Sequence, residues 1–368
     1  MSKKKLPDFI LLGLCVSLVL VGIFILASVS SSFSLQRTGN TFFFLNHQLL
    51  LGVLPGLLAG TIAFFLPLSF FKKYSFLFLL ATIVLLAMVF MPGIGGEFGG
   101  ASRWIFLGPF SFQPSEILKL AFILYAASWL ASRHAKSKKA PNSTLLPFAA
   151  IVGIVSLFLI LQPDVGTLGV IAATGLVMYF LAGTPIWHTA AMIGMGLLAL
   201  GGLIAIVPYR LNRFLVFLNS DLDPLGRGYQ AKQALIGIGS GGLFGTGLGL
   251  SFQKFGSLPE PISDSIFAVF AEELGFVGAV VLLSLFLAFA WRSFVIAKRV
   301  PDPFAKLVVW GIAFWIFLQA TVNIGSMLGL LPLTGIPLPF ISYGGSALMT
   351  ELLACGILLN ISKEAKMP

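Results

Sequence analysis

The sequence predicts an all-α polytopic membrane protein with about ten transmembrane helices, on two observations. Hydrophobic residues occupy 58% of the 368 positions and charged residues only 10%, whereas a soluble domain carries about 25% charged residues. The apolar residues form long continuous runs, which are typical of membrane-spanning helices, while barrel strands alternate apolar and polar residues. We therefore expect residues 1–368 to form a single multi-pass transmembrane domain.

Ten apolar segments have the length of about 17–25 residues that a helix needs to cross a bilayer. The first follows three lysines and resembles a signal peptide. It continues from Phe9 to about Ser30 without an obvious small-residue cleavage site, so we expect a retained span. The expected spans lie near residues 9–30, 46–67, 75–91, 115–132, 144–161, 167–183, 188–207, 265–291, 305–325 and 346–361.

The distribution of Lys and Arg predicts the orientation. With the N-terminus inside, fifteen basic residues fall on inner segments and seven on outer segments, so the positive-inside rule places both termini in the cytoplasm. Five of the seven outer charges lie in one large extracytoplasmic loop, residues 208–264, between helices seven and eight. The net charge of +10 is then explained by topology and contact with anionic lipid, and it does not indicate binding of nucleic acid.

Four polar segments rich in sequence motifs fall on the outer face in this topology, whereas the inner loops are short and basic. We therefore expect a functional site to open toward the outside. The two cysteines, Cys15 and Cys355, fall inside expected spans and offer neither a disulfide framework nor a metal-ligand cluster. The four outer segments are residues 92–116, 162–167, 208–264 and 326–346.

Residues 251–275 hold four of the thirteen acidic residues of the chain, Glu260, Asp264, Glu272 and Glu273. Acids at a membrane boundary are costly and usually face a cavity or a partner. A Leu-Pro-Glu-Pro turn leads to Asp264 and an apolar helix starts directly after it, which places this carboxylate at the lip of the bilayer. The sequence has no Ser–His–Asp or Cys–His pattern and no metal-ligand spacing. Carboxylates would therefore transfer protons if the protein is an enzyme.

A Gln-Pro-Ser-Glu run predicts the start of a helix, because Pro114 suits an early helical position. Glu116 and Lys119 then share one helix face and can form an ion pair. A charged pair inside a span usually marks a polar cavity, and a purely structural ion pair is the alternative. Arg103 lies just before this helix, at interface depth.

Three further features carry less weight. Asp164 in QPDVGT can simply cap the next helix in a tight turn, and it gains weight only from its place on the same outer face. The glycine-rich run GSGGLFGTGLG provides a flexible backbone that could approach a ligand closely. Arg210, Arg213 and Lys232 around it could neutralise a phosphate group or could simply be solvated. Ser342 lies in GLLPLTGIPLPFISYGGS, which cannot be a regular helix and must be buried in protein or line a cavity.

Together these motifs resemble those of the SEDS family (shape, elongation, division and sporulation), whose members include FtsW, RodA and SpoVE. The resemblance covers nearly the whole chain, because five long motifs match in order and spacing. The SFQK and ISYGG sequences look more like the division type, FtsW, than the elongation type. The five motifs are RWIFLGPFSFQPSEILK, QPDVGT, GYQAKQALIGIGSGGLFGTGLG, SFQKFGSLPEPISDSIFAVFAEELGFVG and NIGSMLGLLPLTGIPLPFISYGGS.

The resemblance implies a ten-span protein of the cytoplasmic membrane and an inverting peptidoglycan glycosyltransferase. Its substrate would be lipid II, an undecaprenyl-pyrophosphate-linked disaccharide-pentapeptide, polymerised on the outer face for septal wall synthesis. Asp264 matches the family's essential aspartate, and Glu116 and Lys119 match residues that line its central cavity. Ser265 stands where many members have Phe, which removes no ionisable group. The implied partners are a class B penicillin-binding protein transpeptidase and other division proteins.

The resemblance leads to a hypothesis for the mechanism. Asp264 would act as general base toward the acceptor hydroxyl, in a substrate cavity that also contains Asp164, Glu260 and Ser342. Positive charge, or a divalent cation such as Mg²⁺ or Mn²⁺, would stabilise the departing pyrophosphate. The candidate cations are Arg103, Lys119, Arg210, Arg213 and Lys232.

Two other functions remain open at this point. A transporter that flips lipid II would also have a polar cavity with buried charges. Alternating access, however, calls for a midplane site and often for internal repeats, whereas the motifs lie on one face and the two halves show no repeat. A non-catalytic scaffold for a division complex leaves the cluster of outer acids without a reason.

Overall fold

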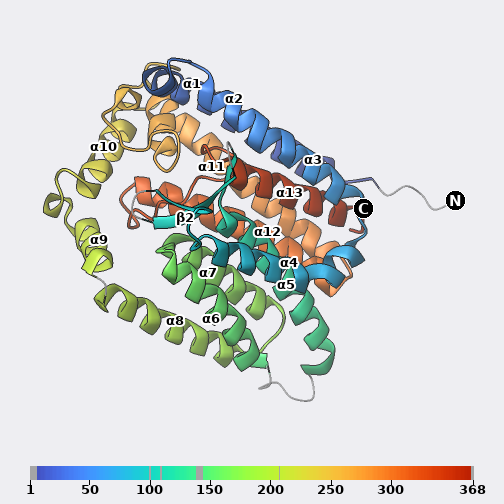
Figure 1. Ribbon diagram of the computed structural model, residues 1–368. Coiled ribbons are helices and arrows are strands. Elements are labelled where there is room, and N and C mark those ends of the chain that lie inside the picture. The colour runs from blue at the N-terminus through green and yellow to red at the C-terminus, as the bar shows by residue number, and fades with distance from the viewer. Residues whose placement is uncertain (1–5, 99–100, 108–109, 138–143, 207, 366–368) are drawn as a thin grey trace.

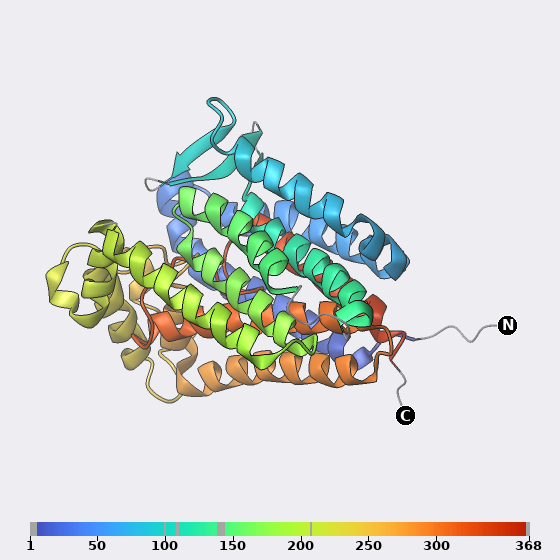
Figure 2. The same cartoon turned by 90° about the horizontal axis from the view of Figure 1, so that it is seen from below.

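The structure is a computed structural model that describes residues 6–98, 101–107, 110–137, 144–206 and 208–365. Its long helices run side by side in one bundle (Figure 1). Both termini lie at one end of this bundle, whereas α9 (Pro208–Leu218) and α10 (Arg227–Ser240) lie at the opposite end (Figures 1 and 2). We call these the terminal end and the distal end.

The helices of the first half are α1 (Phe9–Thr38), α2 (Phe43–Gln48), the π-helix η1 (Leu49–Val53), α3 (Leu54–Phe65), α4 (Leu68–Met88), α5 (Pro114–Ser137) and α6 (Leu145–Leu161). Those of the second half are α7 (Val165–Leu181), α8 (Ile186–Ile206), α9, the 3-10 helix η3 (Ser220–Leu222), α10, the 3-10 helix η4 (Gln253–Phe255), α11 (Ile266–Arg299), α12 (Pro303–Met327) and α13 (Gly345–Ser362). Several helices begin at an aspartate that caps the first turn. Asp8 accepts a hydrogen bond from Leu11 N at 2.8 Å, and Asp302 accepts one from Ala305 N at 3.1 Å.

Every expected span coincides with an apolar helix of this bundle. Within the described residues, eight helical segments are long and apolar enough to cross a membrane: α1, the continuous segment Phe43–Phe65, α4, α5, α8, α11, α12 and α13. The helices α6 and α7 are apolar but have only 17 residues each. They therefore lie at the lower limit of about 17 residues for a spanning helix.

A small antiparallel sheet at the distal end was not expected from the sequence. It has the order β1 (Gly95–Phe98), β2 (Ala101–Leu107) and β3 (Phe110–Phe112), and Figure 2 shows it projecting beside the bundle. Because side chains alternate along a strand, Arg103 and Ile105 share one face of β2. Ile105 is buried, so this face is directed toward the protein.

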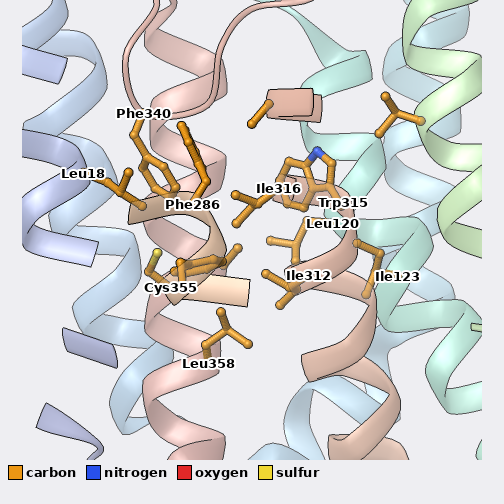
Figure 3. Close-up of a cluster of buried hydrophobic side chains, with 14 of the residues drawn as sticks. Leu18, Leu120, Ile123, Phe286, Ile312, Trp315, Ile316, Phe340, Cys355 and Leu358 are labelled. Carbon is orange, nitrogen blue, oxygen red and sulfur yellow. The ribbon is translucent and has the colours of Figure 1, made fainter. Parts of the chain in front are cut away.

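The centre of the bundle is formed by α12, α13 and α5. In the most apolar 18-residue stretch of each helix, 78% of the residues are buried in α13 and 67% in α5 and in α12. In α8 the share is 0%, so α8 is peripheral. Figure 3 shows the core where these helices meet α1 and α11. Its labelled side chains are Leu18, Leu120, Ile123, Phe286, Ile312, Trp315, Ile316, Phe340, Cys355 and Leu358.

Part of the glycine-rich run of the large loop packs closely against α11. Gly237 and Gly239 lie inside α10 rather than in a loop. A Cβ on Gly241 would collide with the carbonyl oxygen of Ala271, and one on Gly245 with that of Glu273. These glycines therefore allow the backbone to pack closely against α11, which is a packing role that the composition alone did not distinguish from ligand binding.

Close packing of α3 against α13 also depends on glycine and gives a first prediction. A Cβ on Gly356 would collide with the carbonyl oxygen of Gly60. We expect Gly356→Ala to separate the helices and to lower the free energy of unfolding by about 1–3 kcal/mol, measured by thermal unfolding in detergent. The control is Gly13→Ala in α1, where no atom lies within 4 Å of the added Cβ and where alanine favours the helix. Equal stability of the two variants would contradict the close approach.

Candidate functional site

The four polar segments expected on the outer face meet at the distal end. The Ser342 hydroxyl donates to the carbonyl oxygen of Ser263 at 2.6 Å, which joins the last segment to the large loop. Arg103 of β2 donates to the carbonyl oxygens of Gln162, at 3.2 Å, and Pro163. The first segment therefore contacts the second through the small sheet, which the sequence pattern did not predict.

Asp264 lies two residues before α11, where these polar segments come together. Its carbonyl oxygen accepts a hydrogen bond from Asn323 Nδ2 at 2.9 Å, and the same nitrogen donates to the carbonyl oxygen of Ile336 at 2.9 Å. A Cβ on Gly335, whose φ is +72°, would lie 3.3 Å from Asp264 Oδ2. The peptide of Asp264 is thus held by α12, while its half-buried carboxylate faces the bare backbone of Gly335.

The surroundings of Asp264 change its protonation. The pKa of the carboxyl is raised to about 6, mainly by burial and also by the nearby Glu260 carboxylate. Arg103 and Arg213 oppose this rise in pKa, and Asp164 adds to it. The site thus brings together five of the predicted residues. A carboxylate with a pKa near the working pH can accept a proton at neutral pH and release it again.

Asp164 and Glu260 have different supporting roles around this carboxylate. Asp164 is buried, caps α7 by accepting from Thr167 N at 3.2 Å, and accepts from the Ser115 hydroxyl at 3.2 Å. Glu260 is exposed, and its carboxylate accepts from the Ser263 hydroxyl at 2.9 Å. The capping role expected for Asp164 is therefore present, and it holds the residue where its charge acts on Asp264.

Glu116 and Lys119 form a separate buried cluster within the bundle. Lys119 Nζ lies 2.7 Å from Glu116 Oε2 and donates to Gln319 Oε1 at 2.7 Å. The Trp315 indole also donates to this oxygen, at 2.8 Å, while Gln319 Nε2 donates to the carbonyl oxygen of Pro337 at 2.9 Å. The ion pair thus supports the non-helical stretch before α13 through Gln319.

Glu351 of α13 supports the same stretch from another side. Its Oε2 accepts a hydrogen bond from Phe340 N at 2.7 Å, where the backbone has a left-handed φ of 63°. Its Oε1 is buried and has no hydrogen-bond partner among the residues described. Glu116 and Lys119 both interact with it electrostatically. Two acids and one lysine are therefore close together inside the apolar bundle.

The remaining predicted residues lie farther from Asp264 or have other partners. The Ser342 hydroxyl is buried, and it also accepts from Leu338 N at 2.8 Å, so it connects two loops. Arg210 donates to the carbonyl oxygen of Ile160 at 3.3 Å at the end of α6. Lys232 forms an exposed ion pair with Asp221 at 2.5 Å.

A basic cavity of about 180 Å³ lies next to this site. Arg213, Arg227 and Lys232 contribute positive charge to its wall, and Leu333 contributes an apolar side chain from the stretch before α13. Arg213 also acts electrostatically on Asp264. The cavity is therefore positioned to hold an anionic group beside the carboxylate.

Glu272 and Glu273 were noted in the sequence without a role, and they anchor the loop that carries Asp264. Glu272 accepts hydrogen bonds from the Ser251 hydroxyl and from Phe252 N, at 3.0 Å for the latter. Glu273 pairs with Lys254 at 3.0 Å and accepts from the Ser28 hydroxyl at 2.7 Å. Both carboxylates are buried, so they act within the fold rather than on a ligand.

Gln319 and Asn323 were not predicted from the sequence, although their spacing in α12 is a signal that could have indicated them. The two amides are four residues apart, so they share one helix face, and an amide in a span usually pairs within the protein. What the sequence lacked was the identity of their partners, which are carbonyl oxygens of Pro337 and Ile336, on the far side of a turn.

The described residues include no group of three or more His, Cys, Asp or Glu side chains that could hold a metal ion. Mg²⁺ is often bound by one or two carboxylates together with substrate phosphates. A divalent cation beside Asp264 and Glu260 would therefore take most of its oxygen ligands from the substrate.

Known proteins are similar to this chain in sequence and in fold over nearly its whole length. A family model for FtsW, RodA and SpoVE, described as cell cycle proteins, matches residues 9–367. Stage V sporulation protein E of Bacillus subtilis (strain 168) is 40% identical over 369 residues, which cover 99% of each chain. A probable peptidoglycan glycosyltransferase FtsW of Geobacter sp. (strain M18) is 40% identical over 362 residues, covering 98% of this chain and 97% of that protein.

Among solved structures, a chain from a peptidoglycan synthase complex that coordinates polymerization and crosslinking superposes with a TM-score of 0.77. It is 28% identical and covers 98% of this chain and 99% of its own. The eight helical segments of the described residues that are long and apolar enough to cross a membrane define a multi-pass membrane protein. The chain belongs to the FtsW/RodA/SpoVE family.

The Lys254–Glu273 pair gives a second prediction. Glu273→Gln leaves the buried Lys254 ammonium without its carboxylate, and removal of one partner of a buried pair costs about 3–5 kcal/mol of stability. The double variant Lys254→Met with Glu273→Leu should recover most of this loss, because an apolar pair needs no charge compensation. The control is Lys232→Gln, which breaks an exposed pair and should cost at most about 1 kcal/mol. Thermal unfolding that ranks all three variants alike would contradict the anchoring role.

Proposed function

We propose that this protein is a peptidoglycan glycosyltransferase that polymerises lipid II into glycan strands on the outer face of the cytoplasmic membrane. The observation that carries the proposal is Asp264, a carboxyl with a pKa of about 6 that two arginines approach at the distal end. The name of the Geobacter relative and the description of the solved complex support it. Resemblance of the SFQK and ISYGG sequences to the division type supports a role in septal wall synthesis.

The proposed topology has ten spans in a single domain, with α6 and α7 crossing the membrane like the eight longer segments. Both termini are cytoplasmic, as the excess of Lys and Arg on that side indicates. Residues 208–264, between the seventh and eighth spans, are then extracytoplasmic. This orientation places the distal end, with Asp264, at the outer surface, where the head of a lipid-linked donor lies.

In the proposed reaction, Asp264 takes the proton of the acceptor sugar's 4-hydroxyl as that oxygen attacks the anomeric carbon of the donor. A carbon–oxygen bond forms, the bond to pyrophosphate breaks, and the electron pair leaves with the pyrophosphate. The α-linked donor becomes a β-linked product, so one displacement inverts the configuration. At neutral pH Asp264 is mainly a carboxylate, because its pKa is about 6, and it can act as the base.

Arg103 and Arg213 stabilise the departing pyrophosphate in this proposal, because they act electrostatically on the same carboxylate. Arg213 also lines the basic cavity, together with Lys232. Arg210 and Lys119 contribute less to stabilising the pyrophosphate, since Arg210 has a backbone partner and Lys119 is buried in the bundle. Mg²⁺ or Mn²⁺ bound to the pyrophosphate would add positive charge at the same place.

The second candidate is a lipid II transporter. The buried cluster of Glu116, Lys119 and Glu351 favours it, because charges inside a bundle often mark a transport path. The same cluster is accounted for by its hydrogen bonds to the stretch before α13.

The proposed partner is a class B penicillin-binding protein transpeptidase with a single span, in line with the described function of the similar complex.

The third prediction tests the base directly. Glycan polymerisation from purified lipid II is measured with the full chain and its cognate transpeptidase, for wild type and for Asp264→Asn. We expect polymer from wild type and a loss of about 100-fold or more in the variant, which keeps the shape but cannot accept the proton. Asp302→Asn is the matched control, because Asp302 only caps the start of α12 and asparagine also caps helices. If Asp264→Asn makes as much polymer as wild type, Asp264 is not the general base. If wild type makes no polymer, the transporter is favoured.

The fourth prediction concerns pH. A base must be deprotonated, so kcat/KM should rise with pH through an apparent pKa of about 6. Arg103→Gln removes a charge that lowers the pKa of Asp264, so the rise of kcat/KM should move to higher pH. Glu260→Gln removes a charge that raises this pKa, so the rise of kcat/KM should move to lower pH. Shifts in the same direction for both variants would contradict the electrostatic account.

A further inference from the structure

An apolar groove lies at the terminal half of the bundle, between α1, α3 and α13. It has a volume of about 600 Å³ and is walled almost entirely by apolar side chains. Its rim is open, because Val16, Leu20 and Leu57 are between 47% and 59% exposed. Its floor includes Cys15 and Cys355, both buried. The proposed reaction uses none of these residues.

The length of the groove matches one leaflet of a bilayer. In α1 it extends from Leu12 to Ile23, which is about 16 Å at about 1.5 Å per residue. The hydrocarbon core of a bilayer is about 30 Å thick, so one leaflet is about 15 Å. Pro7 and Phe65 line the groove at the terminal end, where both chain ends lie (Figure 1). A chain in the groove would therefore enter from the leaflet at that end.

A cation lies at the mouth of the groove. Lys363 follows α13, and its Nζ lies 3.4 Å from the centroid of the Phe64 ring and donates to the carbonyl oxygen of Phe64 at 2.6 Å. Phe64 itself lines the groove. In the part of the chain that the structure describes, the salt bridges do not include Lys363. An apolar channel as long as an acyl chain thus ends at an ammonium with no carboxylate partner.

We infer that this groove binds one anionic phospholipid, with an acyl chain between α1, α3 and α13 and the phosphate at Lys363. In the proposed orientation the lipid belongs to the cytoplasmic leaflet. The head of the lipid-linked substrate in the proposed reaction lies at the distal end, whereas Lys363 lies beside Phe64 at the terminal end, so the two head groups would bind at opposite ends of the bundle. The groove is a second lipid site, separate from the reaction.

Native mass spectrometry of the purified full chain tests this inference, with phosphatidylglycerol and phosphatidylcholine of identical acyl chains as probes. We expect wild type to retain one phosphatidylglycerol at lower lipid concentration than phosphatidylcholine. Thr61→Trp fills the groove from an exposed position and should weaken this binding at least tenfold. Lys363→Gln should weaken it about fivefold, because one basic residue contributes about that much to binding of anionic lipid.

Two matched variants serve as controls and should leave the retained lipid unchanged. Leu198→Trp places the same ring on the exposed face of α8, and Lys73→Gln removes an exposed lysine from α4. Thermal unfolding without added lipid shows whether each variant is folded, and Lys363→Gln remains informative if Thr61→Trp is not. Three results would overturn the inference: equal retention of both lipids by wild type, unchanged retention by folded Thr61→Trp and Lys363→Gln, or displacement of phosphatidylglycerol by an equal concentration of undecaprenyl phosphate.

Discussion

The non-helical backbone between α12 and α13 is the feature on which the rest of this structure depends. Peptide groups in a bilayer have no water to pair with, so backbone without helical hydrogen bonds persists at membrane depth only where protein pairs with it. Gln319, Asn323 and Glu351 each pair with a peptide group of residues 328–344. The cost of burying these polar side chains is offset because each one satisfies backbone that would otherwise be unpaired.

This arrangement connects the interior of the bundle to the distal surface. Lys119 donates a hydrogen bond to Gln319, and Gln319 donates one to the stretch before α13. Asn323 donates hydrogen bonds both to that stretch and to the carbonyl oxygen of Asp264. A charged cluster in the core and the peptide group of Asp264 therefore belong to one network of hydrogen bonds. Buried charges are costly wherever they occur, and here they set the position of a group whose chemistry depends on a narrow range of geometry.

The two ends of the protein then have different tasks. The distal end gathers polar loops, two arginines and Asp264, whereas the terminal end presents an apolar groove and Lys363 to lipid. Close approach of α3 and α13 through Gly60 and Gly356 places the groove beside a helix that also supports the distal loops. Lipid packing at one end and polar chemistry at the other thus share α13.

The sequence by itself determined the class of the protein, because apolar runs long enough to cross a bilayer are set by composition and length. It also indicated Asp264 and the Glu116–Lys119 pair, since charges near apolar segments are rare enough to be recognised. Only the tertiary structure decided the small sheet, the packing role of the glycine-rich run and the partners of Gln319 and Asn323. These features depend on contacts between segments far apart in the chain, and local pattern does not specify which backbone group a buried side chain will meet.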